Sequence, residues 1–135
     1  MSRLLDWQGR LEAYLSAVAR TPWRPGTQDC VIFAVGWRQA VTGIDLMEDF
    51  RGAYTTLEQG FELLRAQGWP DHISAVTQGL EECPPHRMVM ADLVTVEGAE
   101  GEPAFGGCGG GHLHVLHPRG LGLLPLTAAM RCWRL

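Results

Sequence analysis

The spacing of apolar residues changes within the second half of the chain, and this change limits the folds that the sequence can adopt. Up to about residue 80, apolar residues recur every three to four positions, which predicts amphipathic helices. From residue 87 onward, short apolar runs alternate with Gly, Pro and charged residues, which predicts short strands joined by turns. Helices followed by strands indicate the α+β class. The 135 residues contain no linker-like segment, so we expect a single domain over residues 1–135.

Two of the expected helices are marked by their apolar faces. An N-terminal helix is expected over residues 1–20, where apolar side chains fall on one stripe. A central helix is expected over residues 29–43, with Gly43 as its C-cap. Apolar residues nearly encircle this second helix, so we expect it to be buried at the centre of the domain.

The remaining elements are marked by capping residues and turns. Thr55 and Glu58 match a capping box, which predicts a helix that begins there, and Asp71 is placed to cap a short helix. The strands expected over residues 87–135 read as an antiparallel meander that closes with the terminal segment 129–135.

A glycine-rich stretch, GGCGGG at residues 106–111, invites comparison with a phosphate-binding loop. It lacks the Lys-Ser/Thr pair of a P-loop and the strand-to-helix context of a dinucleotide fingerprint. Glycines within a strand more often mark a bulge or the close approach of another element. We expect that element to be the helix over residues 29–43.

The composition disfavours two classes of partner. The net charge is −4 and no basic run is present, which argues against nucleic-acid binding. No apolar run approaches the ~20 residues of a membrane span, and charges lie throughout the N-terminal segment. We therefore expect neither a membrane span nor a signal peptide, and synthesis in a cytoplasm.

The four cysteines are Cys30, Cys83, Cys108 and Cys132, and they form no CxxC pair. This spacing argues against a zinc ribbon or a redox dithiol, and a cytoplasmic origin argues against a disulfide scaffold. We therefore expect no cofactor and no metal. The alternative is that the four scattered thiols converge on a metal ion or an iron–sulfur cluster.

Cys30 stands where the central helix is expected to begin. The unpaired N–H groups of a helix start stabilise a thiolate, which makes this a candidate nucleophile. The preceding loop, TPWRPGTQD, contributes Trp23, Gln28 and Asp29 as candidate site residues. Asp29 is expected to act as an N-cap rather than as a catalytic acid. The competing interpretation is that Cys30 is a small buried residue at the start of a core helix.

A cysteine nucleophile also needs an imidazole within hydrogen-bond reach. Strand alternation places His112 and His114 on one face of the expected sheet, so Cys30 with either histidine is a candidate catalytic dyad.

Several short motifs in a fixed order resemble a known family. WRPGTQDCVIFAVGWRQAVTGIDL is followed by RGAY, ADLVTV, a strand of small residues and a terminal CWRL. This order, across most of residues 20–135, is similar to that of the phage and prophage relatives of the NlpC-type cell-wall cysteine peptidases. These belong to the papain-like superfamily. The resemblance implies a papain-like fold in which N-terminal helices pack on a small C-terminal antiparallel sheet.

The resemblance also implies roles for individual positions. Cys30 matches the nucleophile, and ADLV resembles the Gly-Asp-Leu-Val that opens the first sheet strand, with Ala91 in place of Gly. The second strand matches AFGGCGG, so Ala104 stands where the catalytic histidine is expected. The third polar position falls near His114.

Two functions follow from this resemblance. The first is a tail-tip protein of a phage or phage-like particle that cleaves peptidoglycan peptides during DNA entry. The second is a catalytically degenerate subunit of the tail tip that binds hub proteins. Either protein would be made in a bacterial cytoplasm and assembled into the tail.

Overall fold

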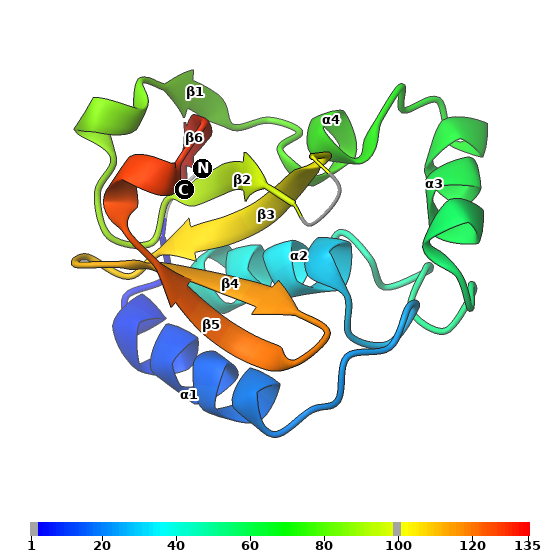
Figure 1. Ribbon diagram of the computed structural model, residues 1–135, viewed down its shortest axis with the longest axis horizontal. Helices are drawn as coiled ribbons and strands as arrows, with labels where there is room; N and C mark the ends of the chain where they lie inside the picture. Colours follow the sequence, from blue (N-terminus) through cyan, green and yellow to red (C-terminus); the bar gives the residue numbers. More distant parts are fainter. Residues whose placement is uncertain (1–2, 99–100) are drawn as a thin grey trace.

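In the computed structural model, which describes residues 3–98 and 101–135, the two longest α-helices pack on one face of a six-stranded antiparallel sheet (Figure 1). The helices are α1 (Trp7–Ala19), α2 (Cys30–Thr42), α3 (Leu57–Ala66) and α4 (His72–Val76). The strands are β1 (Glu81–Cys83), β2 (Leu93–Glu97), β3 (Pro103–Cys108), β4 (Leu113–His117), β5 (Gly120–Leu124) and β6 (Arg131–Arg134). Two 3₁₀ segments, η1 (Pro85–Arg87) and η2 (Leu126–Ala128), lie between strands. The order of helices before strands confirms the α+β class.

The central helix has the expected boundaries. α2 is capped by the Asp29 side chain and ends at Gly43, whose φ of 83° is in the left-handed region that favours glycine. α1 is shorter than expected, because the backbone N–H of Leu4 is bonded to Val41 at the end of α2 instead of entering a helix. Residues 1–2 of the expected N-terminal helix lie outside the described residues.

The cap of α3 lies one residue later than expected. Thr56, not Thr55, accepts the backbone N–H of Gln59 at 3.2 Å. The side chain of Gln59 reaches back to the backbone N–H of Thr55 at 3.0 Å, so Gln59 rather than Glu58 completes the reciprocal cap. Asp71 caps α4 as expected, through the backbone N–H of Ser74 at 2.7 Å.

The sheet is not a simple meander. Its strand order is β1-β6-β2-β3-β4-β5, so β2 to β5 follow one another while β6 returns across the sheet to lie between β1 and β2 (Figure 1). The strands expected over residues 87–135 do not include β1. Its three residues, Glu-Glu-Cys, carry no apolar alternation. β1 is a strand because β6 pairs with it.

The two faces of the sheet are packed differently. α2 packs on the inner face, where its fully buried Trp37 donates from Nε1 to the backbone oxygen of Ala91 at 2.8 Å. A Cβ on Gly107 of β3 would overlap the Trp37 ring, which confirms that this glycine marks the close approach of the central helix. The outer face carries a smaller apolar cluster that includes Val94, Val96 and Cys132.

The turn into β2 has an unusual backbone conformation. Ala91 has a φ of 81°, in the region that favours glycine, and its side chain is fully buried. A Gly at this position would adopt this conformation without strain.

Candidate functional site

The start of α2 is organised by one buried carboxylate. Oδ1 of Asp29 accepts the backbone N–H groups of Val31 and Ile32 at 3.0 and 2.9 Å. Oδ2 accepts the backbone N–H of Gly26 at 2.9 Å and the hydroxyl of Tyr54 at 2.6 Å. Asp29 is fully buried, so these four hydrogen bonds compensate its loss of hydration. The expected N-cap is therefore confirmed, and its carboxylate is fully engaged in holding the loop.

Close packing around Gly26 fixes the loop before Cys30. Gly26 has a φ of 85°, and a Cβ there would overlap the backbone oxygen of Tyr54. The backbones of Arg24 and Gln28 exchange hydrogen bonds at 2.8 and 2.7 Å. Gln28 is buried and contributes to the shape of the loop rather than to the lining of the cleft described next.

A cleft of about 480 Å³ opens beside Cys30, where the ends of β2, β3 and β4 meet the start of α2. Its lining is Trp23, Cys30, Leu57, Val96, Glu97, Gly98, Glu102, Ala104, Phe105, Val115, Leu116, His117, Pro118 and Leu124. Most of these side chains are apolar, and two carboxylates, Glu97 and Glu102, are exposed beside them. Cys30 is only partly buried, so its thiol borders this cleft. The cleft is a candidate binding site.

The strand positions that face α2 within this cleft are apolar. Gly106 of β3 pairs with Val115 of β4; Phe105 precedes Gly106, Leu116 follows Val115, and both belong to the core that contains α2. Ala104 lies opposite Val96 and packs with the outer-face cluster, so its side chain lies on the other side of the sheet. Ala104 lines the cleft, but the inward-facing position beside it belongs to Phe105. Neither Ala104 nor Phe105 therefore places a proton-accepting side chain in the cleft.

The Cys30 thiol is not activated by its surroundings. Burial, followed by the neighbouring Asp29 carboxylate, raises the pKa of Cys30 to about 12, while the backbone N–H groups of the helix start act in the opposite direction. The N-cap carboxylate thus offsets the positive end of the helix dipole. At neutral pH the group is a thiol, which is a poor nucleophile.

The structure does not bring His112 or His114 to Cys30. His112 is exposed in the hairpin between β3 and β4, where its backbone oxygen accepts the N–H of Gly109. His114 faces α2, but its ring lies against Trp37, 6.0 Å between centroids, and Trp37 follows Cys30 by two turns, about 10 Å along the helix axis. Burial, and then the nearby His112, lowers the pKa of His114. Neither histidine lines the cleft.

Another histidine, His117, lines the cleft but is turned away from the thiol. Its Nδ1 accepts the backbone N–H of Arg119 at 3.2 Å, which leaves the proton of the neutral ring on Nε2. Its Nε2 lies over Gly122 on the outer face of β5. His117 is therefore not positioned to accept a proton from Cys30.

His72 packs against Phe105, one of the residues that line the cleft. Its Nε2 lies 3.1 Å from the backbone oxygen of Pro103, and its ring packs between Phe61 and Phe105. His72 therefore supports the position of Phe105.

Several residues of this region were not identified from the sequence. Tyr54 lies 25 positions from Asp29, and although it is part of the RGAY motif, the sequence gives no sign of its bond to Asp29. Glu97 ends β2 and Glu102 immediately precedes β3. The pairing of β2 with β3 brings both carboxylates to one cleft. Local sequence carries no signal for these contacts, which depend on strand register.

The four cysteines do not converge on one site. Cys30 borders the cleft and Cys108 is buried in the outer-face cluster. Among the residues that the structure describes, one group has the spacing of metal ligands, and it consists of Cys83, Cys132 and Asp92. A site built from all four thiols is therefore not formed.

The fold and site define an α+β domain with a cysteine-bordered, mostly apolar cleft. The chain belongs to the DUF6950 family, a domain of unknown function, whose model matches residues 2–135. No curated protein and no solved structure matches the chain. Within residues 3–98 and 101–135, no helix is both long enough and apolar enough to cross a membrane.

Proposed function

We propose that this chain is a non-catalytic descendant of the NlpC-type cell-wall peptidases that serves as a tail-tip subunit of a phage or phage-like particle. In this proposal the cleft beside Cys30 binds a segment of a hub protein. The chain is made in the bacterial cytoplasm and enters the tail during assembly.

One observation carries the proposal. Cys30 stands at the helix start that a papain-like nucleophile would occupy, yet Phe105 and Leu116 are the inward-facing strand residues of its cleft. These apolar groups can neither accept a proton from the thiol nor orient a base. A catalytic role would need an imidazole at this position, and loss of a general base typically costs about 10²–10⁴ in rate.

The chemistry of the cleft favours a polypeptide ligand with apolar and basic side chains. Its apolar lining provides burial for side chains of a partner, and burial of apolar surface drives association. The exposed carboxylates of Glu97 and Glu102 add attraction for Lys or Arg and orient the bound segment.

Charge reversal at the cleft is expected to weaken this binding. Glu97→Arg should lower the affinity for the tail-hub protein at least tenfold, because one cation of the partner then meets a like charge. Glu62→Arg, on the exposed side of α3, is the matched control and should change the affinity less than twofold. Binding is measured by calorimetry with a purified tail-hub protein.

The binding and peptidase functions differ in whether Cys30 is required for infectivity. Particles that carry Cys30→Ala should assemble and remain infectious if the subunit only binds. Loss of infectivity from fully assembled Cys30→Ala particles, or cleavage of muropeptides by the wild-type protein, would show that Cys30 is a working nucleophile.

A further inference from the structure

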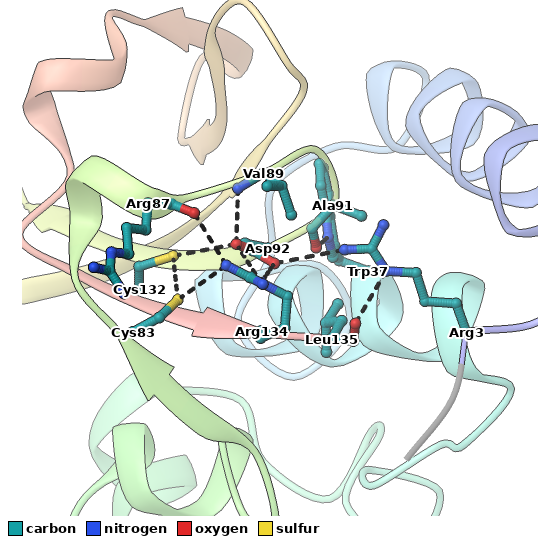
Figure 2. A network of polar contacts seen from close by, with 10 residues as sticks. All are labelled: Arg3, Trp37, Cys83, Arg87, Val89, Ala91, Asp92, Cys132, Arg134 and Leu135. Carbon is teal, nitrogen blue, oxygen red and sulfur yellow. Dashed lines mark hydrogen bonds and ion pairs between the residues drawn. The ribbon is translucent and has the colours of Figure 1, made fainter.

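A second thiol site lies on the opposite part of the sheet from the cleft. Cys83 of β1 and Cys132 of β6 are directly opposite in the antiparallel pairing, and their sulfur atoms are 3.5 Å apart (Figure 2). Directly opposed residues of antiparallel strands have Cα atoms about 4.5–5.5 Å apart, within the range of about 4.4–6.8 Å that disulfides span. Side-chain rotation alone can therefore bring the two sulfur atoms to bonding distance.

The two thiols of this pair differ in burial and in their polar neighbours. Cys132 is fully buried and donates to Oδ2 of Asp92 at 3.5 Å, whereas Cys83 is only partly buried. Nη2 of Arg134 lies 3.7 Å from the Cys83 sulfur, and its Nε donates to Asp92 at 3.1 Å (Figure 2). Because Cys83 is partly exposed and Cys132 is buried, a peroxide from solvent reaches Cys83 first.

Asp92 is the fixed centre of this network. It is fully buried, accepts the backbone N–H of Val89 at 2.9 Å and pairs with Arg134 and, at 3.6 Å, with Arg3. Arg3 also donates to the backbone oxygen of Leu135 at 3.0 Å, so the network ties both ends of the described chain to the start of β2 (Figure 2).

We propose that Cys83 and Cys132 are a reversible oxidation site at which a peroxide forms a disulfide between β1 and β6. The Cys83 sulfur loses its proton to solvent and attacks one peroxide oxygen, the O–O bond breaks, and Cys83 becomes a sulfenic acid. The Cys132 sulfur then attacks the Cys83 sulfur, the S–O bond breaks and water leaves. Asp92 accepts the Cys132 proton and passes it to the departing hydroxide, so the oxygen leaves as water and Asp92 is again a carboxylate. Two thiols and one hydrogen peroxide thus yield one disulfide and two water molecules; an alkyl hydroperoxide would yield one water and one alcohol.

The same three donor groups have the spacing of a metal site, and the position of Arg134 distinguishes the two possibilities. Its guanidinium contacts both Asp92 and Cys83, so a bound cation would lie beside a positive charge on two of its three ligands. A disulfide is neutral and leaves the pairing of Asp92 with Arg134 intact. The geometry therefore favours the thiol pair as an oxidation site.

Oxidation of the wild-type protein tests this site directly. Reduced, metal-free protein treated with one equivalent of hydrogen peroxide should lose two hydrogen atoms in its intact mass. A non-reducing digest should then contain a peptide that links Cys83 to Cys132, and dithiothreitol should reverse the change. Because the bond joins strands 49 positions apart, the melting temperature should rise by about 5–10 °C.

Single variants separate this pair from the other thiols. Cys83→Ser should abolish both the linked peptide and the rise in melting temperature, whereas Cys108→Ser should retain both. The inference is overturned by a linkage that involves Cys30 or Cys108, or by accumulation of unlinked sulfinic acid at Cys83. It is also overturned if one equivalent of Zn²⁺ binds to the reduced protein and protects both thiols from peroxide. These readouts do not depend on the function proposed for the cleft.

Discussion

Replacing Asp29 with Ala is expected to lower the free energy of unfolding by about 3–5 kcal/mol. The change leaves three backbone N–H groups and the hydroxyl of Tyr54 without their buried acceptor. Each unsatisfied buried group costs about 1–3 kcal/mol, and water entering the vacated space recovers part of the sum. Urea unfolding measures the loss, and the melting temperature should fall by about 10–15 °C.

Asp71→Ala is the matched control for this substitution. Asp71 also caps a helix, but it is exposed and accepts the backbone N–H of Ser74. Its loss should cost about 1 kcal/mol, which is typical of an exposed N-cap. If the two variants were destabilised equally, Asp29 would be an ordinary cap and not the centre of the loop.

Gly107→Ala is expected to cost about 2–4 kcal/mol, because the new methyl group overlaps a ring that has no room to move. Trp37 is fully buried and is fixed by its hydrogen bond to Ala91 and its edge contact with Phe33. Gly111→Ala is the control, since open space surrounds a Cβ at that position, and it should change the unfolding free energy by less than about 0.5 kcal/mol.

A double-mutant cycle tests the physical cause of this cost. In a Trp37→Leu background the smaller side chain leaves space for the methyl group, so Gly107→Ala should cost at least about 1 kcal/mol less than it does alone. Equal costs in the two backgrounds would mean that backbone conformation, not contact with Trp37, is the reason that Ala is unfavourable at position 107.

The elements predicted from the sequence are those determined by local chemistry. α2 begins at Cys30 and ends before Gly43, because an Asp cap, an apolar face and a glycine C-cap act within a few residues. Asp71 identified α4 for the same reason. The cap of α3 was displaced by one residue because Thr55 and Thr56 are adjacent and both can cap a helix.

The features that the sequence did not reveal depend on pairing between distant segments. β1 exists because β6 crosses the sheet to meet it. The inward position beside Ala104 belongs to Phe105 because the register of β3 against β2 sets the phase of alternation. The same register directs His114 toward Trp37 instead of Cys30. Local pattern identified the candidate nucleophile, but strand register determines which residues surround it.

The reactivity of Cys30 as a function of pH tests the central claim that this cleft binds and does not catalyse. Iodoacetamide labelling of the Cys30 peptide, followed by mass spectrometry between pH 7 and 10, measures the fraction of thiolate. With a pKa of about 12, Cys30 should label on the order of 10³-fold more slowly at pH 7 than an ordinary thiol, and the rate should rise about tenfold per pH unit. Rapid labelling that is already maximal at pH 7 would reveal an activated thiolate and contradict this account.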